Sequence, residues 1–253
     1  MNKLELKKYC QSQEAVAHMK GWDFSHIKGR FQSYEKDLPW NYKDIVKKYL
    51  KPQDKLLDID TGGGEMLLSF NHSHNLTTVT EGFAPNVRLC NEKLKPMGIR
   101  VCEVTDYTNM PFEDGEFDVV INRHGTYDAE ELYRILKPGG VFVTQQVGED
   151  NDRELVELLL PGSKKPFPGM NLASQKAKFI KAGFSVLEEN EAFRPIEFYD
   201  VGALCWFARI IEWEFAGFSV DKCFDRLIEA EKIIEEEGCI KGNVHRYLIV
   251  ARK

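Results

Sequence analysis

The chain has 253 residues, 43% of them hydrophobic, which is enough for one large domain or for one domain with a sizeable appendage. Its formal net charge of -6 argues against a protein that grips nucleic acid over a broad surface, because such binding depends on many lysines and arginines. The six cysteines stand singly, without a C-x-x-C pair, so the sequence indicates neither a zinc site nor a redox dithiol.

The N-terminal sequence MNKLELKKYC lacks the apolar stretch of a signal peptide. No run approaches the roughly 18 uncharged apolar residues that a membrane-spanning helix needs. We therefore expect a cytoplasmic protein with no membrane segment.

The first 50 residues predict a helical cap. One amphipathic helix is indicated by apolar residues at helical spacing, from Tyr42 to Leu50, and it ends before Pro52. Aromatic residues gather in the same segment: Trp22, Phe24, Phe31, Tyr34 and Trp40. They either close over a site or belong to an N-terminal helix that packs on the edge of the sheet.

Strand-like and helix-like segments then alternate along the chain. The strand-like runs cover residues 55–60, 77–82, 98–104, 117–123 and 139–147, and helices are expected at 64–70, 85–95 and 128–136. The strand-like runs are continuously apolar, which is typical of strands covered on both faces. This alternation predicts a doubly wound parallel sheet.

The last third of the chain extends the pattern. A helix at 171–182 ends at Gly183, and residues 184–193 and 245–253 read as strands, which brings the total to seven. Residues 200–237 predict two helices inserted before the last strand. The segments 21–30 and 161–170, rich in Gly, Pro and aromatic residues, are expected to be loops.

A glycine-rich turn follows the first strand, in the sequence LLDIDTGGGE at residues 56–65. Such a turn before a helix exposes backbone N–H groups that a polar ligand can approach closely. A phosphate-binding P-loop is excluded because no Gly-Lys-Ser/Thr follows. The dinucleotide fingerprint is incomplete, because Gly62 and Gly64 are correctly spaced but Leu67 replaces the third glycine.

Acidic residues flank this turn. Asp58 and Asp60 precede it, and a carboxylate there suits an ammonium or sulfonium group better than a pyrophosphate. Glu81 ends the second strand, where a carboxylate can accept hydrogen bonds from ribose hydroxyls. Together these residues favour a nucleoside with a cationic tail.

Four segments, LLDIDTGGGE, VTEGFAPN, VTDYTNMPFEDGEFDVVINRH and ELYRILKPGGVFVTQQ, resemble in order and spacing the motifs of class I S-adenosylmethionine-dependent methyltransferases. The resemblance covers about residues 45–147 and is closest to the subset with D-x-x-x-[LM]-P-F and L-K-P-G-G. We therefore expect an α/β, Rossmann-like sheet of seven strands, mostly parallel with an antiparallel last strand. Residues 1–50 would form the helical cap, and residues 51–253 the methyltransferase domain with its helical insertion at about 200–237.

The resemblance implies that S-adenosylmethionine is the cofactor and that no metal is needed. In the family the first motif contacts the methionine part, the acidic end of the second strand holds the ribose, and a later acid bonds the adenine. The cofactor-binding residues implied are Asp58, Asp60, Gly62, Gly64, Glu81, Gly82, Asp106, Tyr107 and Asn122. The family commonly has a small or apolar residue at one of the two aspartate positions, so which of Asp58 and Asp60 faces the cofactor stays open.

Arg123 and His124 follow the fourth strand, where ligands bind in sheets of this kind, and are the candidate catalytic residues. His124 is a candidate base for an acceptor that must lose a proton, or else a structural histidine. Arg123 would hold a carboxylate or phosphate of the acceptor, or else pair with an acid such as Asp128. Gln145 and Gln146 end the fifth strand at the same edge.

The missing N-P-P-[YF] and D-P-P-[YF] motifs and the acidic charge favour a small-molecule acceptor over nucleic acid. Methyl transfer to such an acceptor is an in-line displacement, for which alignment and exclusion of water matter most. The alternatives are an RNA or protein methyltransferase and a non-catalytic module that binds S-adenosylmethionine.

Overall fold

The computed structural model describes residues 1–18 and 23–253, so Trp22 and the start of the loop expected at 21–30 lie outside the described residues. The chain divides into two compact units. Unit 1 comprises Met1–Leu38, Glu149–Pro168 and Ala192–His245, and unit 2 comprises Pro39–Gly148, Gly169–Glu191 and Arg246–Lys253. The boundaries expected from the sequence, 1–50 and 51–253, stay a prediction.

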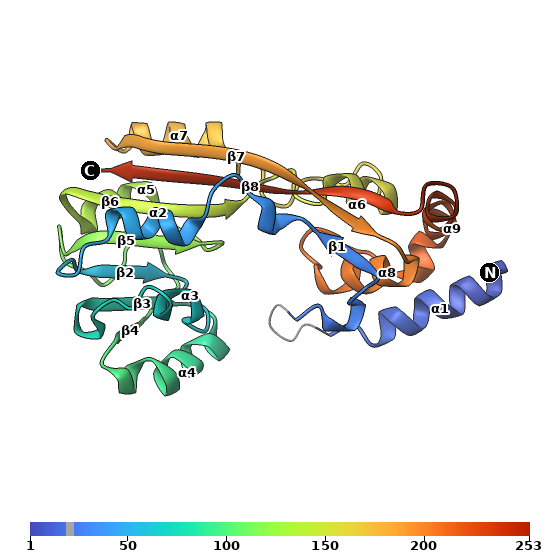
Figure 1. Cartoon of the computed structure of the whole chain (residues 1–253), viewed down its shortest axis with the longest axis horizontal. Coiled ribbons are helices and arrows are strands. Elements are labelled where there is room, and N and C mark those ends of the chain that lie inside the picture. Colours follow the sequence, from blue (N-terminus) through green and yellow to red (C-terminus); the bar gives the residue numbers. More distant parts are fainter. Residues whose placement is uncertain (19–22) are drawn as a thin grey trace. The chain divides into compact units, whose positions relative to one another are not determined.

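Unit 2 is built on a mostly parallel sheet (Figure 1). Its parallel strands lie in the order β6-β5-β2-β3-β4, and β8 pairs with β6 in the antiparallel direction. The strands are β2 (Leu56–Ile59), β3 (Thr77–Glu81), β4 (Arg100–Glu103), β5 (Phe117–Arg123), β6 (Leu136–Val147) and β8 (Ile240–Arg252). The order continues beyond β8 with β7 (Ser185–Phe198) and β1 (Phe31–Ser33), and β7 and β8 have residues in both units.

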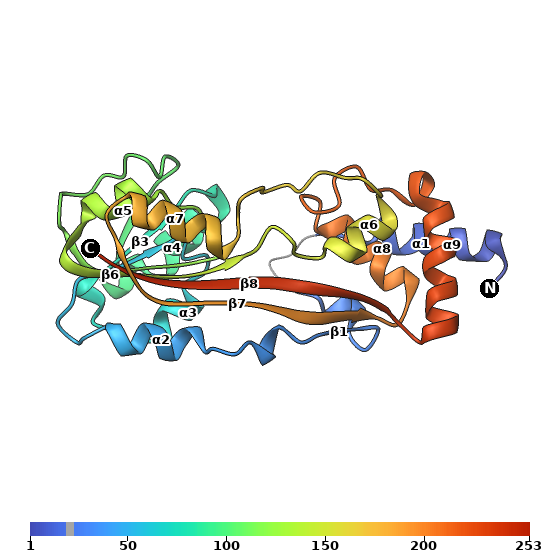
Figure 2. The ribbon, with the colours of Figure 1, turned by 90° about the horizontal axis from the view of Figure 1, so that it is seen from above.

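Helices cover both faces of the unit 2 sheet, as Figure 2 shows. Because successive strand residues point to opposite faces, Leu56 and Leu57 enter different cores. Leu56 packs with residues of α2, α3 and α4, whereas Leu57 packs with residues of α5 and α7. These helices are α2 (Tyr42–Tyr49), α3 (Glu65–Leu68), α4 (Ala84–Lys93), α5 (Ala129–Ile135) and α7 (Leu172–Lys181).

The helices of unit 2 begin where the sequence supplies caps. Asn41, Asp128 and Asn171 precede α2, α5 and α7, and each side chain accepts a hydrogen bond from a backbone N–H of the first turn. Pro85 lies in the first turn of α4, where its missing N–H costs nothing. These local signals explain why the helices predicted at 85–95, 128–136 and 171–182 form close to those bounds.

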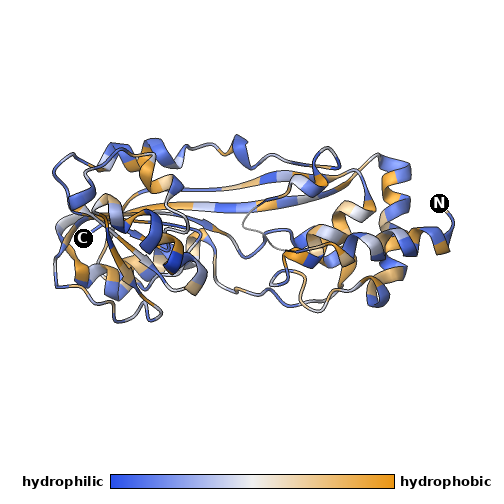
Figure 3. Ribbon diagram, turned by 90° about the horizontal axis from the view of Figure 1, so that it is seen from below, coloured by the Kyte–Doolittle hydropathy of each residue, from blue (hydrophilic) through white to orange (hydrophobic). Residues whose placement is uncertain are grey.

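Unit 1 has its own apolar core, formed by α1 (Lys3–Ala15), α6 (Arg153–Leu159), α8 (Val201–Ile210), α9 (Val220–Glu237) and strand residues. Hydrophobic residues run along α8 (Figure 3). Phe24 and Phe31 of the N-terminal segment pack against Trp206, Phe207 and Phe198 of this core. These two aromatic residues therefore pack into the core of unit 1, although neither lies in an α-helix as the packing alternative expected.

The predicted α/β sheet with an antiparallel last strand is confirmed, and so are the two helices between 200 and 237. The sequence did not predict every element. The sheet has eight strands because the short β1 pairs with β7, and α6 lies in a segment that we assigned to no element. None of the helices in the described part of the chain is both long and apolar enough to cross a membrane.

Candidate functional site

The carboxyl ends of β2 and β5 mark the point where the chain connections diverge. From β2 the sheet continues to β3 and β4 on one side and to β5 and β6 on the other. Open α/β sheets bind ligands at such a switch point, because the loops on either side leave a crevice there. Large polar side chains are buried at this edge of the sheet: Asp58, Glu81, Asn122, Gln145 and Gln146.

The glycine turn after β2 has an unusual backbone. Asp60, Gly62 and Gly64 have φ values of 55°, 63° and 76°, a left-handed region that glycine enters at little cost. Helix α4 supports the turn, because the Cys90 thiol donates to the Gly62 carbonyl at 3.2 Å and Lys93 Nζ to the Gly63 carbonyl at 2.8 Å. The turn is thus held in place by the protein.

The Glu81 side chain, at the end of β3, contacts the glycine turn. Its buried carboxylate accepts hydrogen bonds from the Gly62 N–H at 2.5 Å and from Asn86 Nδ2 at 3.2 Å. Burial raises the pKa of Glu81, and the nearby Asp60 charge raises it further, against the effect of the Gly62 hydrogen bond. Gly82 follows, and a Cβ there would lie 2.6 Å from the Val104 carbonyl oxygen, so only glycine fits.

Asp58 and Asp60 add two more carboxylates to this edge. Burial, with the neighbouring charges of Asp60 and Glu81, raises the pKa of Asp58 to about 7, although the Thr61 hydroxyl donates to it at 2.6 Å. Partial burial also raises the pKa of Asp60. Three crowded acids with raised pKa values favour a bound cation, since a positive charge would offset their mutual repulsion.

Asp60 reaches across the edge of the sheet. Its carboxylate accepts hydrogen bonds from the Tyr107 hydroxyl and, at 2.9 Å, from the Thr126 N–H. Because its φ is positive, the strand geometry ends at Asp60 and strand alternation does not fix its direction. The structure therefore brings Tyr107 and Asp60 together, a pairing that the sequence did not predict.

Asp106 directly precedes Tyr107, the partner of Asp60. Its exposed carboxylate accepts hydrogen bonds from the N–H of Thr108 at 2.9 Å and from its hydroxyl at 2.6 Å. These two bonds lower the pKa of Asp106, so it stays ionised. An ionised, exposed acid at the end of β4 remains available to a ligand.

Asn122 is fully buried at the end of β5. Its Nδ2 donates to the Ile59 carbonyl at 3.0 Å, and its Oδ1 accepts a hydrogen bond from Gln146 Nε2. These bonds connect β2, β5 and β6 at the carboxyl ends. Its predicted place beneath the transferred methyl stays a prediction.

Arg123 and His124 follow directly and are both exposed. Asp128, the suggested partner of Arg123, caps α5 instead, and the Arg123 guanidinium forms no ion pair within the described residues. His124 has a φ of 61°, and its ring Nε2 lies 3.3 Å from Gln145 Nε2. A Cβ at the next residue, Gly125, would lie 2.6 Å from Asp60 Cβ, so the turns after β5 and β2 touch.

The histidines of the NHSHN segment have structural contacts. His72 Nε2 lies 2.8 Å from the Asp54 carbonyl oxygen, and His74 Nδ1 lies 3.1 Å from that of Met97. Across residues 1–18 and 23–253 no group of three His, Cys, Asp or Glu side chains is arranged to hold a metal ion.

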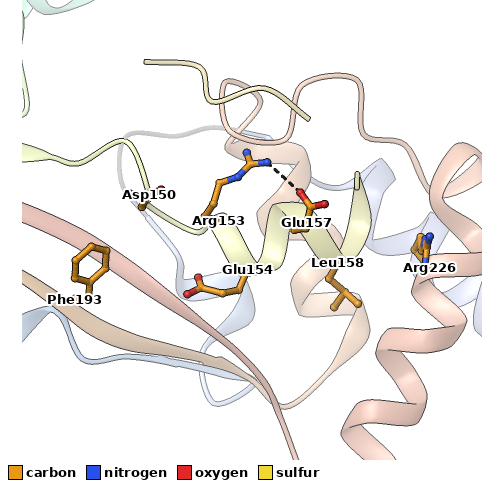
Figure 4. A pocket seen from close by; sticks show the side chains of 7 residues that line it. All are labelled: Asp150, Arg153, Glu154, Glu157, Leu158, Phe193 and Arg226. Carbon is orange, nitrogen blue, oxygen red and sulfur yellow. Dashed lines mark hydrogen bonds and ion pairs between the residues drawn. The ribbon is translucent and has the colours of Figure 1, made fainter. Parts of the chain in front are cut away.

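Two cavities are lined by residues other than those of the glycine turn. Unit 1 has a cavity of about 760 Å³ with side chains of both charges, lined by Asp150, Arg153, Glu154, Glu157, Leu158, Phe193 and Arg226 (Figure 4). Arg153 and Glu157 form an ion pair there at 3.2 Å. Unit 2 has a cavity of about 370 Å³ beside Asp118 and Val119, at the opposite end of β5 from Arg123.

Several known proteins that are similar to this chain are named as methyltransferases. Residues 57–144 match the family model described as a methyltransferase domain. The 24-methylenesterol C-methyltransferase 2 of Arabidopsis thaliana is 31% identical over 174 residues, which cover 60% of this chain and 46% of that protein. The demethylmenaquinone methyltransferase of Staphylococcus saprophyticus is 27% identical over 142 residues, covering 50% of this chain and 61% of that protein. The chain thus spans less than two thirds of each relative.

The fold is also similar to that of a solved structure. The crystal structure of a methyltransferase-like protein from Bacillus halodurans superposes with a TM-score of 0.59 at 16% identity, covering 84% of this chain and 98% of that one. The family match lies wholly within unit 2 and includes the glycine turn, Glu81 and the end of β5. Unit 2 therefore contains a segment, residues 57–144, that matches a methyltransferase domain.

Proposed function

We propose that this protein transfers a methyl group from S-adenosylmethionine to a small-molecule acceptor at the carboxyl edge of β2, β3 and β5. The observation that carries the proposal is the group of three carboxylates, Asp58, Asp60 and Glu81, around a glycine turn. Burial is the main cause of their raised pKa values, and a cation beside them would favour their charged forms. S-adenosylmethionine carries an ammonium and a sulfonium group, so its charge complements the site.

The residues present fit this cofactor. Gly62 and Gly64 have no side chains, so the methionine part of the cofactor could approach the backbone there, next to Asp58 and Asp60. Glu81 would accept hydrogen bonds from the ribose, with Gly82 keeping space beside it. Asp106 and Tyr107 would hold the adenine. When bound, the cofactor supplies a methyl group on a positively charged sulfur, and Asn122 would keep the strand ends aligned beneath it.

The acceptor would lie beside Arg123 and His124, which are exposed at the same edge. Two relatives are named for methyl transfer to a sterol and to demethylmenaquinone, both small molecules with a ring system. We therefore propose an acceptor of that size rather than an RNA or a protein. The surrounding protein has to orient the acceptor and exclude water, which needs no metal.

A radiolabel assay tests this function. The full-length protein is incubated with S-adenosylmethionine labelled in its methyl group and, separately, with a demethylmenaquinol, a 24-methylenesterol, total RNA and a protein extract. We expect label in at least one small-molecule extract.

Glu81→Gln should lower kcat/KM about tenfold or more, because it removes a charged hydrogen-bond acceptor. Glu113→Gln, at an exposed site, should not lower kcat/KM.

Other outcomes contradict the proposal in different ways. Label in RNA or protein alone would support the macromolecular alternative. Tight cofactor binding with no transfer to any acceptor would support a non-catalytic binding module.

A further inference from the structure

Trp40, Gln145 and His124 form a chain of side-chain contacts within unit 2. The Trp40 indole Nε1–H donates to Gln145 Oε1 at 2.8 Å. Gln145 Nε2 in turn lies 3.3 Å from His124 Nε2. The backbone connects the same two residues, because the His124 N–H donates to the Gln145 carbonyl at 2.9 Å. His124 is therefore held to Gln145 by both its ring and its backbone.

The chemistry of these groups fixes where the imidazole proton lies. An indole nitrogen can only donate, so the Gln145 oxygen must face Trp40. The Gln145 NH₂ group then faces His124, and an amide nitrogen can also only donate. His124 Nε2 must accept this hydrogen bond, which leaves the ring proton on Nδ1. The opposite amide orientation would set two donors against each other at Trp40.

We propose that Trp40 and Gln145 are positioning residues that hold His124 in the Nδ1–H tautomer, so that its ring donates a hydrogen bond to the acceptor. Nδ1 makes no hydrogen bond with the described residues, and His124 as a residue is exposed. Because the Nε2 lone pair is used by Gln145, His124 is not free to act as the general base suggested from the sequence. The donor role toward the acceptor rests on the proposed function, whereas the tautomer does not.

The charges around the ring also favour the neutral form. Desolvation by the surrounding protein, together with Arg246 on β8 and Arg123 on β5, lowers the pKa of His124 well below its ordinary value. A neutral imidazole then presents its Nδ1–H throughout the neutral pH range.

The substrate class follows from the donors available. Arg123 and the His124 Nδ1–H are both hydrogen-bond donors, and Arg123 is positively charged. Their complement is an oxygen that carries negative charge, such as a phenolate, an enolate or a carboxylate. We infer that the acceptor places such an oxygen beside these two residues.

Nuclear magnetic resonance tests the tautomer directly. Two-bond proton–nitrogen spectra of the nitrogen-15-labelled full-length protein, without ligand, identify the protonated ring nitrogen, and the spectrum of His124→Gln assigns the signals among the six histidines. We expect the Nδ1–H form in the native protein. Gln145→Glu should shift His124 to the Nε2–H form and raise its pKa by about one pH unit or more, because a carboxylate accepts from Nε2. Trp40→Phe should give a mixture, whereas Trp213→Phe, at an exposed tryptophan of unit 1, should change nothing.

An Nε2–H form in the native protein, or a His124 signal unchanged in Gln145→Glu, would overturn the proposal. The native spectrum decides the matter even if a variant fails to fold, and it does not depend on methyl transfer. A protein with the Nδ1–H form but without cofactor binding would refute the proposed function alone.

Kinetics test the donor role once an acceptor is found. His124→Asn places an amide N–H near the position of Nδ1 and tolerates the positive φ, so it should keep kcat within about tenfold of the native value. His124→Ala should lose about tenfold more. Equal losses in the two variants would indicate a base and contradict the donor role.

Discussion

Asp58 connects folding with ligand binding through its charge. Its pKa in the folded protein is raised to about 7, mainly by burial, whereas an aspartate in an unfolded chain has a pKa of about 3.9. The folded state therefore holds the Asp58 proton more tightly than the unfolded state does. The contribution of Asp58 to stability is fully present below about pH 4 and is lost as the pH rises toward about 7.

Asp58→Asn should therefore stabilise the ligand-free protein at alkaline pH and weaken cofactor binding. An amide keeps the shape of the side chain but removes the buried charge, so the free energy of unfolding at about pH 8 should rise by roughly 2 to 4 kcal/mol. Thermal unfolding at about pH 5 and about pH 8 measures this, and the gain should be smaller at the lower pH. Asp225→Asn, an exposed site in α9, serves as the control. A variant that is less stable than the native protein at both pH values would contradict this account of Asp58.

Sequence reasoning located most of the polar residues of the site because each ends a strand. It placed Asp58, Glu81 and Asn122 at strand ends, and the structure has them at one edge of the sheet. It could not find the partners of these residues. Tyr107 donates to Asp60 across 47 positions, and Trp40 to Gln145 across 105, and such pairings depend on how the elements pack.

At the scale of elements, the connection between β3 and α4 depends on one glycine, Gly82. Gly82 has an ordinary φ, so its role is to allow close approach of the Val104 carbonyl on the neighbouring segment. A side chain there would push apart the ends of β3 and β4, where Glu81 and Asp106 are expected to hold the nucleoside.

Gly82→Ala should lower both stability and cofactor affinity. The added Cβ would lie 2.6 Å from a backbone oxygen that cannot swing aside, and overpacking of this kind typically costs about 1–3 kcal/mol. Gly63→Ala is the matched control, because a Cβ there would meet only the end of the Glu65 side chain, which can move. Urea unfolding of both variants gives the comparison. Equal losses would show that close packing at Gly82 is not the constraint.

The helices of unit 2 were predictable from their caps and periodicity, whereas α6 was missed. Its residues Leu155, Val156 and Leu159 are buried at helical spacing, a signal that was present in DRELVELLL. Strand β6 begins at Leu136, earlier than expected, because Leu136 pairs with Phe117 before a register shift. The Pro138-Gly139-Gly140 run therefore lies within a strand rather than between two elements.

At the scale of the molecule, the two units differ in how far the sequence explains them. Unit 2 contains the whole family match and every residue of the candidate site. Unit 1 has an independent apolar core made from three separate stretches of the chain, which no local pattern could have joined. The acceptor, accordingly, is inferred here only from the groups at the edge of the unit 2 sheet.

Titration calorimetry with S-adenosylmethionine, S-adenosylhomocysteine and NAD tests the central claim most directly. The three carboxylates and the incomplete dinucleotide motif predict that the first two ligands bind and NAD does not. Glu81→Ala should weaken the binding of both about tenfold or more. Equal binding of NAD, or no binding of S-adenosylmethionine by the native protein, would contradict the account.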